Sequence, residues 1–148
     1  MRRIITVCFC LLSLHVCEAQ KKEISQARTY IKSGKDNDLL SAEKLMTGLL
    51  AKDSANRQNP RIYATWYDAV LHQYESANEK LYLKQKYDTV QFFSLIRTLY
   101  HIAESLDTLD ARPDKKVRVR PEYRENHARQ LDLLRRNLYY GGTFQARK

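Results

Sequence analysis

The sequence predicts an all-α protein. Apolar residues recur every three or four positions along most of the chain after residue 20, which is the spacing of one helix face. No stretch of useful length alternates polar and apolar residues with the period of two that a half-buried strand shows. Residues that cap or end helices stand between the apolar stretches. These three observations together favour a succession of helices.

Residues 1–19 predict a secretory signal peptide. Met1-Arg2-Arg3 is a basic start, and the apolar run Ile4 to Val16 is shorter than the roughly 20 residues that span a bilayer. Cys17-Glu18-Ala19 places small residues where signal peptidase reads them, so we expect cleavage after Ala19. The protein is then exported, periplasmic or outer-membrane-associated, with no transmembrane segment in the mature chain.

Lipidation at Cys17 is an alternative, because Leu14-His15-Val16 loosely resembles the box that precedes a lipoprotein cysteine. Cys8, Cys10 and Cys17 are the three cysteines of the chain, and all precede Ala19. Cleavage there leaves no disulfide, thiol nucleophile or cysteine metal ligand. Residues 20–148 are long enough to form one domain that is held by its own core.

Two short helices are expected first. Ile24, Ala27 and Ile31 lie at helical spacing, and Gly34 can adopt the left-handed conformation that ends a helix. Asn37 or Asp38 can cap the next helix. Its apolar face carries Ala42, Leu45, Met46, Leu49 and Leu50.

A long helix follows the polar connection 54–59, since Asn59-Pro60 joins an N-cap residue to a proline at the first helical position. It has two apolar rows side by side, which indicates burial on two sides, as in the middle of a stack. One row is Ile62, Trp66, Ala69, Val70, Gln73 and Ala77, and the other is Tyr63, Tyr67, Leu71 and Tyr74.

Two more helices complete the prediction. Asp88 can cap the first, with Gln91 three residues on, and Arg112-Pro113 ends it. Its stripe is Phe93, Ile96, Leu99, Tyr100, Ala103 and Leu106. A basic loop, 111–121, leads to Pro121, which can open a last helix. That helix carries Tyr123, His127, Leu131, Leu134 and Leu138 on one face.

Longer pieces of sequence resemble exported tetratricopeptide-repeat (TPR) proteins of the Bacteroidota type, in their N-terminal part. The pieces are residues 42–50, 79–89, 104–107 and 137–144. The resemblance implies antiparallel helical hairpins stacked as a TPR-like right-handed superhelix, and protein–protein scaffolding without a reaction. The strict repeat signature has no clean copy, because Ala69 and Val70 follow Trp66 where leucine and glycine would stand.

Gly141 to Phe144 has the spacing of the element that opens a TPR-like repeat. This spacing predicts that the chain stops inside the first helix of a further repeat and is truncated at its C-terminus. The apolar face that a following repeat would cover is then expected to be exposed.

Catalytic patterns are missing from the sequence. It contains no G-x-S-x-G, no glycine-rich phosphate loop and no H-E-x-x-H. His72 with Glu75 and His101 with Glu104 have a spacing that can direct two side chains at a metal, but no further inward carboxylate accompanies them. His127 lies on an apolar stripe and is expected in the interior. We expect no enzyme activity, no cofactor and no metal.

Charge gives a weaker indication of partners. The net charge is +9, and nine Lys or Arg face four acidic residues between Arg112 and Arg136. Such a stretch is typical of nucleic-acid binding, but an exported protein rarely meets nucleic acid, so we expect none. Arg118 and Arg120 are candidate contacts, and weak binding to anionic envelope polymers is an alternative role for this stretch.

The mature helices are rich in aromatic residues, which suit peptide recognition because rigid rings give large contact area. Trp66, Phe93 and Tyr100 have core spacing, whereas Tyr63, Tyr67 and Tyr74 are the candidates for an exposed binding groove. The sequence thus predicts an envelope adaptor that binds another protein. The alternative is a glycan-binding accessory protein of an outer-membrane uptake system.

Overall fold

The computed structural model describes residues 20–113 and 116–147, so the predicted signal peptide and Cys17 lie outside the described residues. The described chain contains helices and no strand, which confirms the all-α prediction. A first helix covers residues 20–33. It is followed by α2 (Asp36–Lys52), the 3-10 turn η1 (Asn56–Gln58), α3 (Pro60–Tyr82), α4 (Thr89–Asp110) and α5 (Arg124–Ala146).

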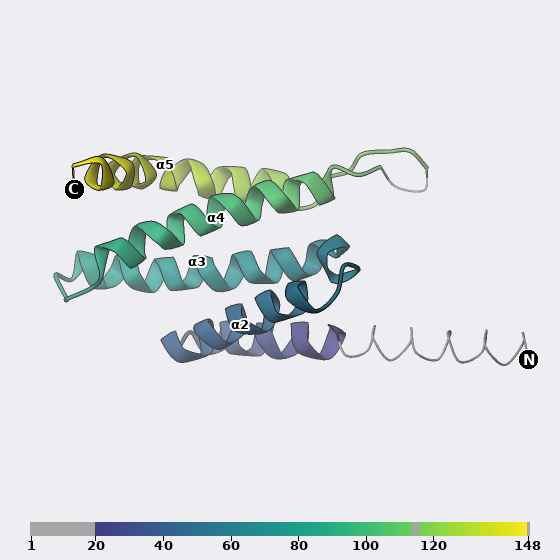
Figure 1. The fold of residues 1–148 in the computed structure, drawn as a ribbon, viewed down its shortest axis with the longest axis horizontal. Coiled ribbons are helices and arrows are strands. Elements are labelled where there is room, and N and C mark those ends of the chain that lie inside the picture. The colour runs from purple at the N-terminus through teal and green to yellow at the C-terminus, as the bar shows by residue number, and fades with distance from the viewer. Residues whose placement is uncertain (1–19, 114–115, 148) are drawn as a thin grey trace, which may run out of the picture.

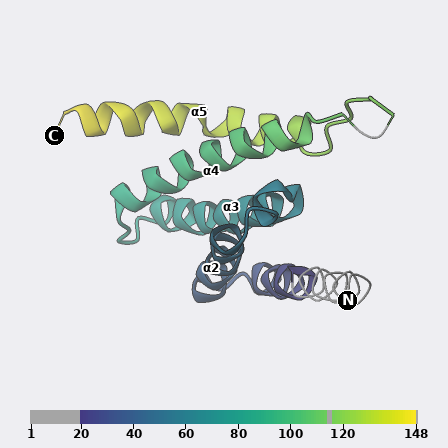
Figure 2. The same ribbon diagram turned by 45° about the vertical axis from the view of Figure 1, so that its right-hand side comes forward.

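Consecutive helices run in alternating directions and lie next to one another in chain order (Figures 1 and 2). Helix α3 packs against α2 on one side and α4 on the other, and α5 packs on α4. The burial of α3 on two sides, predicted from its two apolar rows, is therefore confirmed.

The helix ends that depend on local chemistry are where the sequence predicts them. Gly34 has a φ of +67°, so it takes the left-handed conformation after the first helix. The Asn59 side chain accepts a hydrogen bond from the Arg61 amide at 3.1 Å, directly before Pro60. The Asp88 side chain accepts from the Val90 amide at 2.8 Å and caps α4.

Two predicted starts are wrong by a few residues. Helix α2 begins at Asp36 behind Lys35, so Asn37 and Asp38 lie in its first turn and do not cap it. The turn at Gly34 is tight and lets the next helix begin immediately, and acidic residues are favourable in a first turn. Helix α5 begins at Arg124 and not at Pro121.

The reason for the late start of α5 is a contact with α4. The Tyr123 amide donates a hydrogen bond to the Asp110 side chain at 2.7 Å, which holds the chain in a bend just before the helix. At its other end α5 runs without interruption through Gly141 to Ala146.

The core has two clusters that share α3. One cluster joins the first helix, α2 and α3, with Ile24, Ala27, Ala42, Met46, Leu49, Ile62 and Ala69. The other joins α3, α4 and α5, with Tyr67, Val70, Tyr74, Ala77, Phe92, Leu95, Ile96, Leu99, Ile102, Ala103 and Leu134. The half-buried Trp66 packs against both clusters, so its ring couples the two halves.

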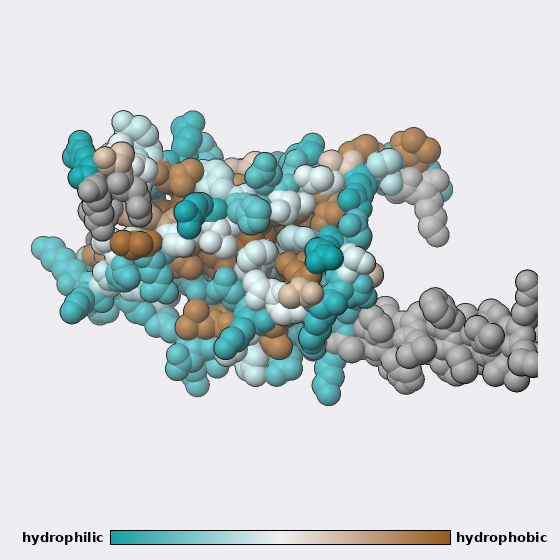
Figure 3. Space-filling view, viewed as in Figure 1, coloured by the Kyte–Doolittle hydropathy of each residue, from teal (hydrophilic) through white to brown (hydrophobic). Residues whose placement is uncertain are grey.

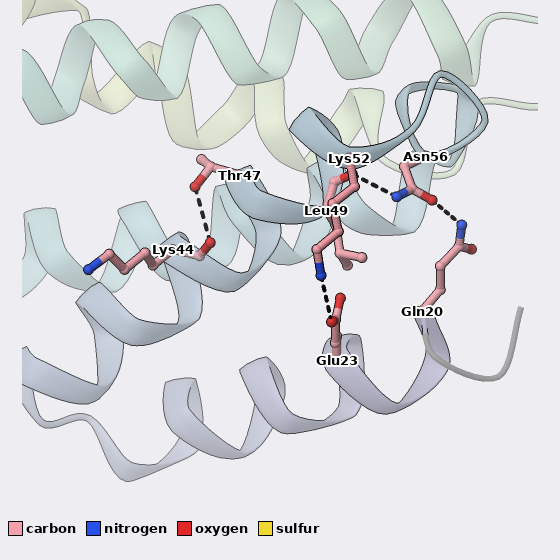
Figure 4. A network of polar contacts seen from close by, with 7 residues as sticks. All are labelled: Gln20, Glu23, Lys44, Thr47, Leu49, Lys52 and Asn56. Atoms are coloured by element: carbon pink, nitrogen blue, oxygen red, sulfur yellow. Dashed lines mark hydrogen bonds and ion pairs between the residues drawn. The ribbon is translucent and has the colours of Figure 1, made fainter. Parts of the chain in front are cut away.

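Polar contacts fix the order of the helices. Glu43 of α2 accepts hydrogen bonds from Trp66 Nε1 at 3.3 Å and Gln73 Nε2 at 2.7 Å, both on α3. Around η1, Gln20 of the first helix donates to Asn56, which donates to the Leu49 carbonyl at 2.6 Å (Figure 4). None of the described helices has the length and hydropathy of a membrane span.

Candidate functional site

Helices α4 and α5 form the outermost pair and meet at Tyr100, whose hydroxyl donates to the Leu131 carbonyl at 2.8 Å. A recess lies on each side of this contact. We call the recess along the first half of α4 the glycine groove, and the recess along the second half of α4 the histidine cleft.

The glycine groove has a volume of about 490 Å³. Gly141 is buried, and a Cβ atom placed on it would come within 2.6 Å of the Phe93 ring. The missing side chain thus lets α5 approach α4 closely. A Cβ on Gly142 would meet no atom within 4 Å, so Gly142 leaves the groove open. The lining is Val90, Phe93, Ser94, Arg97, Leu138, Gly141 and Gly142.

Helix α5 exposes large hydrophobic side chains next to this groove. Leu133 is 80% exposed, Tyr139 is 68% exposed and Tyr140 is 55% exposed. The rings of Tyr139 and Tyr140 meet edge to face with centroids 6.0 Å apart. Leu138 is at 36% exposure and also lines the groove, whereas the helical turn places Leu133 and Tyr140 on a different side of α5. We use the name α5 face for these four exposed residues together, Leu133, Leu138, Tyr139 and Tyr140, which lie on more than one side of the helix.

The histidine cleft has a volume of about 400 Å³ and lies between the end of α4 and the start of α5. Its floor is largely apolar, and Glu104, Asp107 and Asp110 are among the residues that line it. Arg124 forms an ion pair with Asp107, with Nη2 at 3.0 Å from Oδ2, and lowers the pKa of this carboxyl through the hydrogen bond. The cleft therefore has one neutralised carboxylate at its mouth.

His127 lies in the wall of this cleft and is buried, as its place on the apolar stripe predicts. Its ring stacks on Tyr67 at a centroid distance of 3.9 Å and on Tyr123 at 6.0 Å. Burial lowers the pKa of His127, and the charge of Asp110 opposes this effect. The imidazole is therefore held in its neutral form as part of an aromatic stack.

The expected exposure of Tyr67 and Tyr74 is wrong. Tyr67 is fully buried and Tyr74 is 7% exposed. Tyr67 stacks on His127, and Tyr74 accepts a hydrogen bond from Asn137 Nδ2 at 2.9 Å, so both tyrosines fasten α5 to α3. Desolvation raises the pKa of both phenols, in keeping with their burial.

The other candidates remain at least partly accessible. Tyr63 is half-buried beside Trp66, with ring centroids 6.5 Å apart, and Arg118 and Arg120 are exposed on the α4–α5 loop. The five predicted residues do not share one surface, because Tyr67 and Tyr74 are interior. The predicted core residues Phe93 and Tyr100 are half-buried and pack against the α3–α5 cluster.

The sequence prediction missed the α5 face and the glycine groove. Leu138 was assigned to the packed side of the last helix but is exposed. A signal was present, because Leu133 stands beside the buried Leu134 and Tyr139 beside Tyr140, which places apolar residues around more than one side of the helix.

The two histidine–glutamate pairs singled out in the sequence lie on α3 and α4. His72 Nδ1 lies 2.9 Å from Glu75 Oε2, and both side chains are about half exposed. No group of three or more His, Cys, Asp or Glu that could hold a metal occurs among residues 20–113 and 116–147.

Compared with protein-family models, with curated proteins and with solved structures, the chain gives no match.

Proposed function

We propose that this protein is an exported TPR-like adaptor of the cell envelope that binds another protein through the α5 face and the glycine groove. The observation that carries the proposal is the exposure of four large hydrophobic residues on one helix, beside an open groove. Large exposed apolar side chains beside a groove are typical of interaction sites, and aromatic residues dominate the energetics of such sites.

Several features support a protein partner. The groove is lined by apolar and small residues with Arg97 as the charged group, which suits a helix or peptide with apolar anchors. Stacked antiparallel helices, the predicted leader and the resemblance to exported TPR proteins agree with a scaffold. Their arrangement as a right-handed superhelix belongs to this proposal.

The glycan-binding alternative is less well supported. A sugar platform would have to come from the candidate groove residues such as Tyr63 and Tyr67, and the Tyr67 ring is stacked against His127 and fully buried. A sugar needs an accessible ring face, so this pair cannot supply the platform.

Site-directed photocrosslinking in intact envelopes tests the adaptor proposal. A photoreactive residue at Leu138, which lines the groove, should capture a defined protein, whereas the same residue at Leu40, 49% exposed on α2, should not. Gly142→Leu should abolish the Leu138 crosslink, because it places a large side chain in the groove at a position where an added Cβ atom meets nothing within 4 Å. Gly48→Leu is the matched control, since Gly48 also has open space around it.

The proposal fails if positions 138 and 40 capture the same proteins. It also fails if the Leu138 crosslink survives Gly142→Leu unchanged, because the partner would then not occupy the groove.

A further inference from the structure

The α4–α5 loop carries exposed hydrophobic side chains among basic ones. Residues 116–120 read Lys-Val-Arg-Val-Arg, with Val117 83% exposed and Val119 54% exposed. The loop extends beyond the ends of the helices (Figure 1), and hydrophobic atoms stand out on it in the space-filling view (Figure 3). Because the loop extends away from the helices, the apolar interior of a membrane can bury these valines, whereas no described helix of the stack lies next to them.

Val117 also has an unusual backbone. Its φ is +56°, in the left-handed region that glycine and asparagine tolerate and that a β-branched residue avoids. The chain thus keeps an exposed valine where the backbone favours another residue. Local strain of this kind is typical of functional positions.

The fold brings basic residues from distant parts of the sequence to the same end of the stack. The start of the first helix, η1, the start of α3, the end of α4 and the start of α5 all lie there (Figures 1 and 2). Hydrogen bonds between Gln20 and Asn56, and between Arg112 and Gln58, tie these segments together. The basic residues are Lys21, Lys22, Lys52, Arg57, Arg61, Arg112, Lys116, Arg118, Arg120 and Arg124.

Acidic residues at this end only partly offset that charge. Glu23 pairs with Lys52 at 3.1 Å, and Asp107 pairs with Arg124. The other acidic residues described there are Asp53, Asp110, Glu122 and Glu125. The balance is ten basic against six acidic side chains, so this end of the described structure is positive. We call it the basic end.

We propose that the basic end binds the surface of a bilayer that contains anionic lipid headgroups, with Val117 and Val119 entering the interface. Cations attract the headgroups, and apolar side chains gain from the acyl boundary that lies just beneath them. A soluble polyanion would use the cations and leave the valines in water. A protein interface needs roughly 800 Å² from each partner, more than two valines on a loop can offer.

Vesicle cosedimentation tests this proposal. The chain from Gln20, which contains both core clusters, is used because the apolar leader would itself partition into lipid. Vesicles of phosphatidylcholine with about one-third phosphatidylglycerol should bind it, vesicles of phosphatidylcholine alone should bind it far less, and rising salt should release it. Arg118→Gln/Arg120→Gln should weaken binding by about 25-fold, or roughly fivefold for each cation.

Removal of the valines distinguishes lipid from other polyanions. Val117→Asn/Val119→Ser should weaken vesicle binding by about tenfold while leaving the loop conformation intact, since asparagine tolerates a positive φ. Lys84→Gln/Lys86→Gln, at the opposite end, removes the same charge and should change binding less than twofold. Circular dichroism checks that each variant is folded.

Equal binding to neutral and anionic vesicles would overturn the proposal. So would a valine variant that binds as the parent does, or an opposite-end variant that loses as much affinity as the loop variant. If heparin or DNA binds more tightly than the vesicles and the valine variant retains that binding, the basic end is a polyanion site and the lipid assignment is wrong.

Discussion

At the scale of single residues, the stack of Tyr67, His127 and Tyr123 connects burial to pH. The imidazole has an ordinary pKa of 6.5, and burial between the two rings lowers this pKa in the folded protein. The unfolded chain therefore takes up a proton near pH 6.5 while the folded protein still resists it. Stability is fully present above that pH and is lost as the pH falls towards the folded pKa.

We expect the free energy of unfolding to decrease by up to about 1.4 kcal/mol per pH unit below pH 6.5. His127→Phe keeps the stack without a titrating group, so this part of the pH dependence should disappear. His101→Gln, at an exposed histidine of α4, should retain it. Urea unfolding of the three proteins at several pH values measures the difference, and parallel profiles for His127→Phe and the parent would contradict the assignment.

The sequence alone predicts the role of a residue when the groups it contacts are close to it in the chain. Gly34, Asn59 and Asp88 act on backbone groups within a few positions, so their roles follow from local pattern. Tyr67 and Tyr74 are different, because their surroundings come from α5, more than fifty residues later. Periodicity places them on one side of α3 but cannot show that another helix covers that side.

At the scale of helices, the approach of α5 to α4 depends on one glycine. A methyl group at Gly141 would lie 2.6 Å from Cδ1 and 3.2 Å from Cβ of Phe93. The Cβ atom sits close to the backbone, so rotation of the ring alone cannot relieve the contact. At Gly142 the same methyl group meets nothing. Adjacent glycines of one helix therefore differ in whether packing forbids a side chain.

We expect Gly141→Ala to destabilise the protein by about 1 kcal/mol, because overpacking costs about 1–3 kcal/mol and the gain in helix propensity offsets only about 1 kcal/mol of it. Gly142→Ala should instead stabilise by up to about 1 kcal/mol. Chemical denaturation measures both values. In a Phe93→Leu background the cost of Gly141→Ala should shrink, since the ring is the obstacle.

Equal stabilisation by alanine at the two glycines would show that α4 and α5 do not approach closely at Gly141. That result would also remove the floor of the glycine groove and weaken the proposed binding site.

The sequence predicts the burial of α3 better than it predicts the burial of α5, and the reason is physical. The sequence indicates that α3 is buried on two sides, because two adjacent apolar rows occupy much of its circumference and both must be shielded from water. For α5, the predicted stripe correctly includes the buried Leu134 and leaves out the exposed Leu133, but it also includes Leu138, which is exposed. Periodicity cannot show where along α5 the covering helix stops, so it does not distinguish Leu138 from Leu134.

At the scale of the whole molecule, the helices form a linear succession in which the end members have fewer neighbours (Figure 1). Seven hydrophobic side chains of α3 and seven of α4 are buried, whereas α5 buries Leu134 alone among its large hydrophobic residues of described placement. In such arrays, stability is close to a sum of local terms and contacts between neighbours. Opening should therefore begin at an end and spare the middle.

Native-state hydrogen exchange tests that order. We expect the amides of α3 and α4 to exchange with the highest free energy of opening, and those of α5 to exchange at least tenfold faster through a partial opening that leaves α3 closed. The hydrogen bond between Asn137 and Tyr74 should give amides in the middle of α5 a higher free energy of opening than amides at its ends. If α5 is as well protected as α3, the two helices open together, and the exposed α5 face is part of one cooperative unit with the core. If α5 opens first, binding of a partner to the α5 face should slow hydrogen exchange in α5. Exchange in α2 should stay unchanged, because α2 packs against α3 and not against α5.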